Sequence, residues 1–370
     1  MIKVAVNGFG RIGALFTRAY LENWRGQFKL VAINASGTSG NMSPEDVARR
    51  LKHDSNYGNL NELIVAFPDS IVYFPKSEGV ENVGDGGRIK ILGEPDAEKL
   101  PWKELGVDIV IDCTGELLTA EKAEKHLKAG AKKVILSAPP KDENIPMFVY
   151  GVNHSDYKPK MKIISNASCT TNALAPLVKI ISEKWQIISA PFSTIHAFTG
   201  DQRLTDGKHK DPRRSRRAMD NIIPTKTGAD KNIAKIFPEM KGKTQGLAYR
   251  VPTSTVSIID AVFVLNGEIK KEELVDAIKQ AANGKLKGVL GWTEEELVSS
   301  DFLKNPHSGI VDLAAVRVES CEIVSEFKHK KKILKIPFKI TTARIPVWYD
   351  NEWAYAARLG DLLNCVILKM

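Results

Sequence analysis

A glycine-rich turn near the start of the chain constrains the fold more than any other feature. Residues 2–6 (IKVAV) have the composition of a buried strand, the sequence NGFGRIG follows over residues 7–13, and a helical pattern continues over residues 14–24. The motif GxGxxG between a strand and a helix is typical of the first unit of a dinucleotide-binding domain. The N-terminal part of the chain is therefore predicted to form a Rossmann-type α/β domain.

The positions of this motif have distinct physical roles. Gly8 permits the tight turn, Gly10 lets a pyrophosphate approach the backbone, and Gly13 allows the helix to pack closely on the strand. The pyrophosphate would lie at the helix N-terminus, held by the backbone N–H groups of Arg11 and Ile12. We assign these five residues to a cofactor site.

The turn after the second predicted strand, over residues 28–34, bears on the choice of cofactor. A fold that prefers NAD carries Asp or Glu near this point to bind the ribose 2′-hydroxyl, but here Asn34 is followed by Ala35 and Ser36. A carboxylate would repel a 2′-phosphate, whereas small hydroxyl residues with free N–H groups can hold one. The sequence therefore favours NADP, with NAD as the alternative. A turn that merely requires small residues is a simpler interpretation.

Strand and helix patterns alternate up to about residue 165. Strands are predicted over residues 107–113 and 133–137, with a helix over residues 121–129 between them. Such alternation is typical of a doubly wound parallel sheet.

A cysteine in a polar turn is the leading candidate nucleophile. Residues 165–172 read SNASCTTN, and apolar residues recur at helical spacing directly afterwards. Cys169 therefore lies at or next to a helix N-terminus, where unpaired N–H groups and the helix dipole favour the thiolate. A half-buried, inert core cysteine is the alternative, which the hydroxyl-rich flanks argue against.

A histidine downstream is the candidate base for this thiol. His196 follows a segment of strand composition over residues 187–194 and lies one helix and one strand beyond Cys169. A histidine at a strand end can reach a thiol at a helix start in an α/β fold. The other six histidines are interpreted as surface or loop residues.

The second half of the chain has a different pattern. Long strands are predicted over residues 256–265, 316–324 and 334–342, helices over 272–281 and 294–298, and a closing helix over 352–363. We expect an α+β catalytic domain with a largely antiparallel sheet over residues 168–350. The dinucleotide-binding domain would comprise residues 1–167 and 351–370.

Composition limits the class of protein. The chain has 370 residues and is 43% hydrophobic, enough for two domains. No stretch approaches the ~20 apolar residues of a membrane-spanning helix, and a strand starting at residue 2 leaves no room for a signal peptide. The four cysteines are scattered without CxxC spacing, which argues against a disulfide framework and a zinc site. We expect a cytoplasmic enzyme with no membrane partner and no metal.

A basic run contributes to the formal net charge of +9. Residues 208–217 read KHKDPRRSRR, which is more typical of a solvated surface or an anion site than of a nucleic-acid surface, because no aromatic residue interleaves it. Nucleic-acid binding is the secondary alternative.

Several motifs together resemble phosphorylating glyceraldehyde-3-phosphate dehydrogenases. They occur in the family's order: NGFGRIG (7–13), SNASCTTN (165–172), His196, TKTG (225–228), RVPT (250–253) and WYDNE (348–352). The resemblance covers nearly the whole chain. It implies reversible conversion of D-glyceraldehyde 3-phosphate to 1,3-bisphosphoglycerate through a cysteine thioester, with hydride transfer to NAD(P). Erythrose-4-phosphate dehydrogenase, of the same family, is the alternative.

The resemblance also implies a role for each matching residue. Cys169 would attack the aldehyde, and His196 would accept the proton and help the backbone N–H of Cys169 to stabilise the oxyanion. The substrate phosphate would be held by Thr199 and Arg250, and the attacking phosphate by Ser168, Thr170, Thr227 and Gly228, with Arg214 at these anion sites. The cofactor would be contacted by Asn351 at the nicotinamide amide and by Thr114 and Ser137 at the strand ends that line its groove.

Departures from the family pattern support NADP. NAD-specific members carry Asp where this chain has Ala35, and NAD-type members often carry Leu-Pro at residues 207–208. Lys208 could pair with a 2′-phosphate, because the family's loop reaches the adenosine end of the cofactor on a neighbouring subunit. Segments 60–90 and 313–345 are longer than the family norm and are expected to form surface hairpins. A homotetramer is implied by the resemblance alone.

Overall fold

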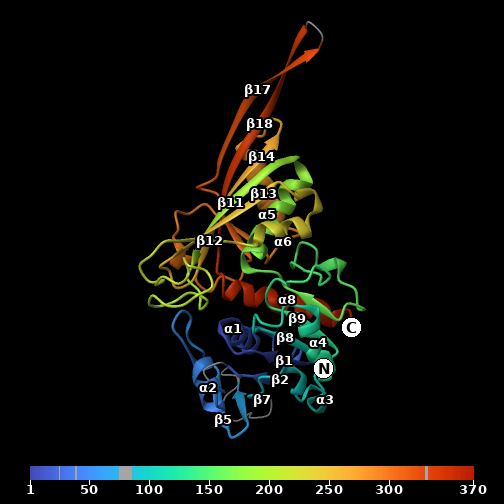
Figure 1. Ribbon diagram of the computed structural model, residues 1–370, viewed down its shortest axis with the longest axis vertical. Helices are drawn as coiled ribbons and strands as arrows, with labels where there is room; N and C mark the ends of the chain where they lie inside the picture. Colours follow the sequence, from blue (N-terminus) through green and yellow to red (C-terminus); the bar gives the residue numbers. More distant parts are fainter. Residues whose placement is uncertain (25, 38–39, 75–85, 330–331) are drawn as a thin grey trace. The chain divides into compact units, whose positions relative to one another are not determined.

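The computed structural model describes residues 1–24, 26–37, 40–74, 86–329 and 332–370. The chain divides into two compact units (Figure 1). The first comprises Met1–Ser168 and Tyr355–Met370, and the second Cys169–Ala354. Each unit is built around one eight-stranded sheet.

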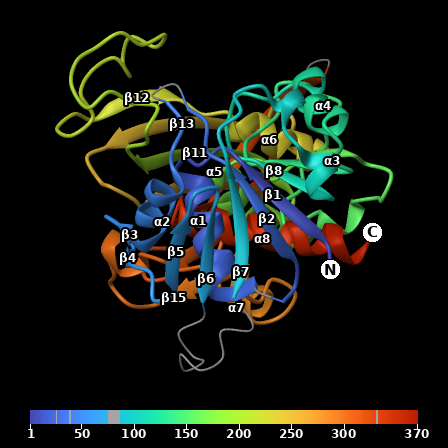
Figure 2. The same ribbon diagram turned by 90° about the horizontal axis from the view of Figure 1, so that it is seen from below.

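The sheet of the first unit has the strand order β10-β9-β8-β1-β2-β7-β6-β5 (Figure 2). Six neighbouring strands are parallel: β10 (Ile163–Ser165), β9 (Lys133–Leu136), β8 (Ile109–Asp112), β1 (Lys3–Asn7), β2 (Lys29–Asn34) and β7 (Gly87–Leu92). The last two strands, β6 (Ser70–Phe74) and the edge strand β5 (Leu63–Phe67), join through antiparallel pairs. The predicted doubly wound sheet is confirmed, and its antiparallel edge makes it mixed.

Helices cover both faces of this sheet because alternate strand residues point to opposite sides. The N-terminal helix α1 (Arg11–Ala19) continues as a π-helical turn (Tyr20–Trp24) and packs so closely that a Cβ at Gly13 would lie 2.1 Å from the Gly8 oxygen. The opposite face packs on Trp102, the first residue of α3 (Trp102–Leu105), in a cluster that includes Ala5 of β1. The remaining elements before Ser168 are α2 (Pro44–Lys52), α4 (Ala120–Lys128), the pair β3 (His53–Asp54) and β4 (Gly58–Asn59), and 3₁₀ turns Ala97–Lys99 and His154–Asp156.

The sheet of the second unit has the order β12-β13-β11-β14-β18-β16-β15, with β17 paired to β18. Its strands are β12 (Ile223–Lys226), β13 (Thr244–Val251), β11 (Ile187–Ala197), β14 (Ser257–Asn266), β18 (Lys332–Tyr349), β16 (Gly309–Asp312), β15 (Leu290–Thr293) and β17 (Arg317–His329). The pairs β11–β13 and β15–β16 are parallel and the other pairs are antiparallel. The expected largely antiparallel sheet is therefore confirmed. Its helices are α5 (Cys169–Lys184), α6 (Ala229–Ile236) and α7 (Lys271–Asn283), with 3₁₀ turns Pro238–Met240 and Ser299–Phe302.

The closing helix α8 (Trp353–Leu368) contributes its residues from Tyr355 onward to the first unit. The Tyr355 hydroxyl donates to the Ala167 carbonyl at 2.9 Å. Farther along, Gly360 lies against the Trp24 ring, where a Cβ would come within 2.2 Å of the indole. The last turns of the chain are thus fitted closely to the first unit.

The helix predicted over residues 294–298 is wrong. This segment is irregular and is followed by the 3₁₀ turn Ser299–Phe302. Five residues are too few to form a helix without strong tertiary support, and three of them are consecutive glutamates. Leu297 instead packs against the cluster of Val256, Phe302 and Ile310.

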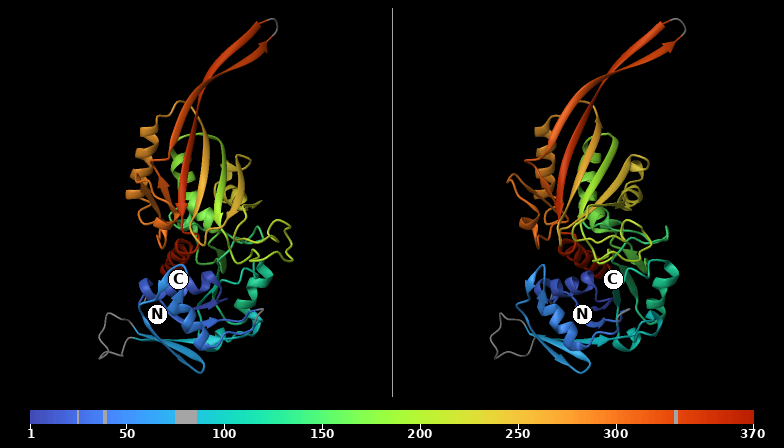
Figure 3. Two further views of the ribbon diagram at one scale, coloured as in Figure 1. Left: turned by 90° about the vertical axis from the view of Figure 1, so that its left-hand side faces the viewer. Right: turned by 60° about the vertical axis from the view of Figure 1, so that its left-hand side comes forward.

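Both long segments form hairpins, as expected. In the second, β17 and β18 form a two-stranded ribbon that continues beyond the rest of its sheet (Figure 3). In the first, β5 and β6 form an antiparallel pair, and residues 75–85 lie outside the described residues. Among the described helices, none is both long and apolar enough to cross a membrane.

Candidate active site

Cys169 is the first residue of α5, as the sequence predicts. The turn before it is held by the Ser165 hydroxyl, which donates to the Ala138 carbonyl at 2.8 Å and accepts from the Ala167 N–H at 3.0 Å. Ala167 has a φ of 55°, a left-handed conformation that costs a non-glycine residue free energy. The turn therefore presents a half-buried thiol at a helix start.

His196 lies next to this thiol, as the sequence predicts. Its Nε2 is 3.6 Å from the Cys169 sulfur. It is the second-last residue of β11, and the register of the parallel β11–β13 pair places Arg250 beside it. A nucleophile and a base thus meet at the end of one strand and the beginning of one helix.

The contacts of Nδ1 fix the orientation of the His196 ring. This nitrogen lies 2.7 Å from the Ala197 carbonyl oxygen and 2.8 Å from Nη1 of Arg250. When Nδ1 carries the proton and donates it to the carbonyl, Nε2 is unprotonated and faces the thiol as an acceptor. That tautomer is the one a general base requires.

The protonation of the pair differs from the sequence expectation of a stabilised thiolate. Burial raises the pKa of the Cys169 thiol, although the Arg250 guanidinium, the Thr170 hydroxyl and nearby backbone N–H groups oppose this shift. Burial, followed by the charge of Arg250, lowers the pKa of His196 to about 3. Both shifts favour a neutral thiol beside a neutral imidazole, so desolvation opposes the thiolate that the helix terminus favours.

Sequence reasoning missed a chain of hydroxyl groups beneath the thiol. The Tyr349 hydroxyl lies 3.0 Å from the Thr170 hydroxyl and 2.8 Å from that of Thr194. The Tyr349 ring also meets the His196 ring edge-on, with centroids 6.0 Å apart. Burial raises the pKa of Tyr349, so this hydroxyl stays protonated. Its position inside the WYDNE motif could have identified it.

Two arginines form the positive part of the site. Arg250 donates from Nη1 to the Ala197 carbonyl at 3.1 Å and to the Thr199 hydroxyl at 3.4 Å. Burial lowers the pKa of Arg250, and the nearby charge of Arg214 adds to the effect. The guanidinium groups of Arg250 and Arg214 thus repel each other in a partly desolvated site. An anion bound between or beside them would stabilise both charges.

Arg214 is held in place by its own loop. Its Nε donates to the Thr225 hydroxyl at 3.0 Å, and its Nη1 pairs with Asp201. Neighbouring arginines of the same basic run also have acidic partners, Asp206 for Arg216 at 3.0 Å and Asp220 for Arg217 at 2.6 Å. Nearby carboxylates therefore neutralise much of the positive charge in the run, which leaves less of it to attract a polyanion such as a nucleic acid.

The residues expected to hold the attacking phosphate lie at two helix starts. Thr227 accepts the Ala229 N–H at 3.2 Å, so its hydroxyl caps α6, whose N-cap residue is Gly228. Thr170 lies in the first turn of α5 with its hydroxyl turned toward Tyr349. Ser168 directly precedes Cys169 and is partly exposed.

The proposed cofactor residues of the first unit gather at the carboxyl ends of its parallel strands. Gly8 has a φ of 93°, and a Cβ there would lie 2.9 Å from the Thr114 nitrogen. At Gly10 a Cβ would meet nothing within 4 Å, so space is open in front of α1. The first turn of α1, which includes Arg11 and Ile12, contains no acidic residue. These features fit a pyrophosphate at the helix N-terminus, with Ser137 directly after β9 on the same edge.

The turn at Asn34 departs from the sequence interpretation. The Ala35 N–H is not free, because it donates to the Leu92 carbonyl at 2.8 Å, and its side chain is buried. The Asn34 amide donates to the Asn7 side chain and to the Glu94 carbonyl, both at 2.8 Å. Of the three residues, Ser36 is the one with a partly exposed side chain.

Two proposed cofactor residues belong to the second unit. Asn351 is buried, and its Oδ1 accepts the Ser257 hydroxyl at 2.9 Å. That hydroxyl accepts the Ala197 N–H at 3.1 Å, which links Asn351 to the strand of His196. Lys208 is exposed, and its carbonyl accepts from Nε of Arg203.

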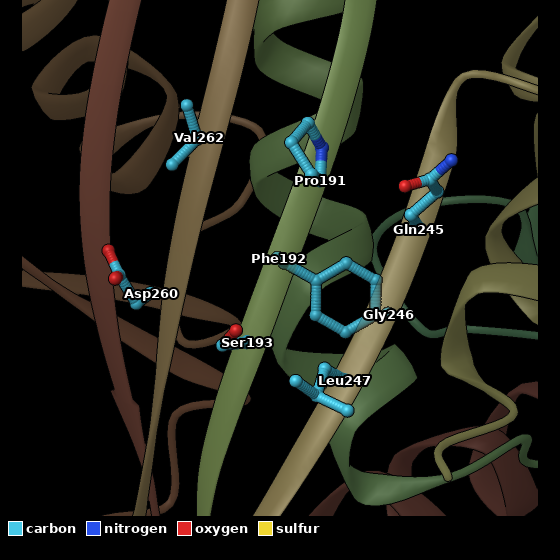
Figure 4. Close-up of a pocket in the computed structure, with 8 residues that line it drawn as sticks. All are labelled: Pro191, Phe192, Ser193, Gln245, Gly246, Leu247, Asp260 and Val262. Carbon is cyan, nitrogen blue, oxygen red and sulfur yellow. The ribbon is translucent and has the colours of Figure 1, made fainter.

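A groove of about 350 Å³ lies elsewhere on the second sheet (Figure 4). It is lined by β11, β13 and β14 through Pro191, Phe192, Ser193, Gln245, Gly246, Leu247, Asp260 and Val262. None of these is a proposed catalytic, phosphate or cofactor residue. Within the described ranges, no group of three His, Cys, Asp or Glu side chains is arranged to hold a metal ion.

Comparison with known proteins decides the family. Residues 2–120 match the family model described as glyceraldehyde 3-phosphate dehydrogenase, NAD binding domain, and residues 168–351 match the one described as its C-terminal domain. The chain belongs to the glyceraldehyde-3-phosphate dehydrogenase family. The family resemblance inferred from the motifs is thereby confirmed over most of the chain.

Curated relatives of this family match the chain from end to end. "Glyceraldehyde-3-phosphate dehydrogenase 2" of Nostoc sp. is 41% identical over 370 residues, covering 100% of this chain and 99% of the relative. "Glyceraldehyde-3-phosphate dehydrogenase 2" of Bacillus subtilis is 41% identical over 372 residues, covering 100% and 98%. "Glyceraldehyde-3-phosphate dehydrogenase A, chloroplastic" of Chlamydomonas reinhardtii is 41% identical over 368 residues, covering 100% and 89%.

Proposed function

We propose that the protein oxidises D-glyceraldehyde 3-phosphate and phosphorylates the product, forming 1,3-bisphosphoglycerate reversibly. The observation that carries this proposal is the 3.6 Å approach of His196 Nε2 to the Cys169 sulfur at the start of α5. Membership of the family supplies the substrate class, since the relatives are named for glyceraldehyde 3-phosphate.

The thiol begins the reaction by adding to the aldehyde carbon. As the carbon–sulfur bond forms, the thiol proton passes to Nε2 of His196, and the new oxyanion is stabilised by the backbone N–H of Cys169 and then by the imidazolium. A bound dinucleotide supplies the hydride acceptor. Loss of hydride from the carbon restores the carbonyl and leaves a thioester on Cys169. An oxygen of inorganic phosphate then attacks this carbonyl, and the thiolate leaves and is reprotonated.

Proton transfer from the thiol depends on a rise in the pKa of His196. An imidazole whose pKa is held at about 3 by burial stays unprotonated at neutral pH, but it is a weak proton acceptor until that pKa rises. Once the substrate places negative charge beside Arg250, the positive field that lowers the His196 pKa weakens, which favours the imidazolium.

The arginines would bind the two phosphate groups. Arg250, with the Thr199 hydroxyl within its reach, would take the substrate phosphate, and Arg214 would serve the same anion sites. The attacking phosphate would lie near Thr227 and Gly228 at the start of α6 and near Ser168 and Thr170 at the start of α5. Charge-assisted hydrogen bonds of this kind are about twice as strong as neutral ones.

NADP is the cofactor we propose, with NAD as the alternative. An Asp or Glu that would bind the ribose 2′-hydroxyl is missing from the sequence directly after Asn34, where Ala35 and Ser36 stand. Lys208 of one subunit would pair with the 2′-phosphate of the cofactor bound to a neighbouring subunit. Asn351 would contact the nicotinamide amide. Thr114 and Ser137 would line the cofactor groove at the strand ends.

Steady-state kinetics test this proposal directly. We expect turnover of glyceraldehyde 3-phosphate that requires inorganic phosphate and has a higher kcat/KM with NADP than with NAD. Without phosphate, one equivalent of reduced dinucleotide and a mass increase on Cys169 should appear. Preference for erythrose 4-phosphate, with no phosphate requirement, would identify the alternative dehydrogenase instead. An equal or higher kcat/KM with NAD would contradict the NADP assignment alone.

We also propose that the protein assembles as a homotetramer. The groove on the second sheet and the exposed apolar side chains of Leu247 and Ile188 near it offer a surface for a second copy. Light scattering coupled to gel filtration should give about four times the chain mass. A monomer at micromolar concentration would contradict this assignment.

A further inference from the structure

The last residues of three adjacent strands are joined by their side chains at the cofactor edge of the first sheet. Asn7 of β1 is in register with Asn34 of β2 and with Asp112 of β8. These three strands are neighbours in the sheet (Figure 2). Asn34 donates to Asn7 Oδ1 at 2.8 Å, and Asn7 donates to Asp112 Oδ2 at 2.8 Å. Ligands of such sheets bind beyond these strand ends.

The chain of hydrogen bonds continues into the helical layer. His126 of α4 lies 3.1 Å from Asp112 Oδ2 through Nε2, and Trp102 of α3 donates from Nε1 to His126 Nδ1 at 3.0 Å. Because an indole N–H can only donate, Nδ1 of His126 is unprotonated and Nε2 carries the proton toward Asp112. His126 is therefore neutral, and its tautomer is set by Trp102.

Asp112 is the centre of this chain. It is 1% exposed, and its four hydrogen-bond donors are all neutral. Oδ2 accepts from Asn7 and His126, and Oδ1 accepts the Thr114 N–H at 3.2 Å and the Thr114 hydroxyl at 2.7 Å. A buried carboxylate is costly unless it is fully hydrogen-bonded, and its removal would leave these donors without an acceptor.

The two ends of the chain lie at residues already assigned to the cofactor. At one end, Asn34 ties the start of the 35–36 turn to Glu94, whose N–H donates to Asn34 Oδ1 at 3.0 Å. At the other end, Thr114 donates two hydrogen bonds to Asp112, and its hydroxyl accepts the Glu116 N–H at 3.2 Å. Both turns are thus oriented through one carboxylate.

We propose that Asp112, held by neutral His126, is a positioning residue that sets dinucleotide affinity by fixing the turns after β2 and β8 together. The inference rests on the proposed function, because it assumes that these turns contact a dinucleotide. It assigns Asp112, His126 and Trp102 a role toward the cofactor without direct contact. Pre-organised turns lose less conformational entropy on binding, which is the physical source of the affinity.

The test compares variants by calorimetric titration with NADP and with NAD, below their unfolding temperatures. In Asp112→Asn one carboxylate oxygen becomes an NH₂ group facing donors, so we expect Kd for both dinucleotides to rise at least tenfold. Asp108→Asn is the matched control. Asp108 directly precedes β8 and accepts the Lys3 N–H at 2.9 Å, and its loss should leave Kd within twofold.

A second pair of variants separates positioning from simple stability. His126→Gln keeps a donor toward Asp112 and an acceptor for Trp102, so Kd should stay near that of the unaltered protein, whereas His126→Leu should weaken binding about as much as Asp112→Asn. The rate of Cys169 alkylation should be the same in all four variants. A lowered Tm with unchanged Kd in Asp112→Asn and His126→Leu would overturn the proposal. If the unaltered protein binds neither dinucleotide, the proposed function fails instead.

Discussion

Nδ1 of His196 lies between the Ala197 carbonyl and the Arg250 guanidinium, at 2.7 Å from one and 2.8 Å from the other. A protonated Nδ1 can donate only to the carbonyl, and an unprotonated Nδ1 can only accept from Arg250. The first arrangement leaves Nε2 as a base, and the second places a proton on Nε2 facing the sulfur. The Ala197 carbonyl therefore favours the tautomer in which Nε2 is the base, and the Arg250 guanidinium favours the tautomer in which Nε2 carries the proton.

Replacement of Arg250 is expected to affect binding and reactivity together. In Arg250→Met the substrate phosphate loses a charge-assisted partner, so KM for glyceraldehyde 3-phosphate should rise about 10- to 100-fold. The Cys169 thiol also loses a cation that lowers its pKa, so alkylation at neutral pH should slow. Arg344→Met, on an exposed arginine of the same sheet, is the control for both measurements. Unchanged alkylation in Arg250→Met would contradict the electrostatic link.

The pH dependence of Cys169 alkylation reports the state of the resting pair. Burial raises the pKa of the thiol, so the rate should increase with pH in a single step above the ordinary thiol value of about 8.5. His196, with a pKa of about 3, should add no step between about pH 5 and pH 7. A second step in that range would mean that the free protein holds a thiolate–imidazolium pair.

Removal of the sulfur should separate chemistry from cofactor binding. Cys169→Ser is expected to lose at least about 10³-fold in kcat, because a neutral hydroxyl is a far weaker nucleophile. Dinucleotide titration should give the same Kd as before, since the residues that we assign to the pyrophosphate lie in the other unit. Cys321→Ser, at an exposed cysteine, should leave both quantities unchanged. Substantial turnover by Cys169→Ser would exclude a thioester mechanism.

Two glycines of the first turn should respond differently to alanine. At Gly13 a Cβ would lie 2.1 Å from a backbone oxygen, so Gly13→Ala should destabilise the protein by about 1–3 kcal/mol or more and lower its Tm. At Gly10 the added carbon meets no protein atom within 4 Å, so Tm should hold. Gly10→Ala should instead weaken dinucleotide binding, because the methyl group occupies the approach of the pyrophosphate. Equal Tm values for the two variants would contradict the packing role of Gly13.

The residue after β2 offers a test of cofactor preference. In Ala35→Asp a carboxylate would repel the 2′-phosphate, so the ratio of kcat/KM for NADP to that for NAD should fall about tenfold or more. Ala35→Asn adds nearly the same volume without the charge and separates crowding from repulsion, which matters because Ala35 is buried. If both variants change the ratio equally, charge at this position does not select the cofactor.

Local patterns in the sequence were sufficient to predict much of the fold. The GxGxxG turn and the start of α5 at Cys169 depend on neighbouring residues, so both were predicted correctly. The helix expected over residues 294–298 failed because a five-residue pattern was overridden by the packing of Leu297. Helix α1 begins at Arg11, three residues earlier than its apolar pattern suggests.

The candidate site was harder to predict where it depends on distant residues. The pairing of Cys169 with His196 followed from the order of elements, but the protonation of the pair depends on burial, which a linear sequence does not reveal. The orientation of Asn34 depends on Glu94, sixty positions later. Asp112 was missed because its significance arises only when three strand ends meet.

The discontinuity of the first unit has a consequence for biosynthesis. The C-terminal turns of α8, from Tyr355 onward, fit against Ala167 and Trp24. These turns are synthesised after the whole of the second unit, so the first unit stays incomplete, with apolar surface uncovered, until they emerge from the ribosome. Loss of the turns from Tyr355 onward would therefore leave a defect in the part of the molecule that was synthesised earlier.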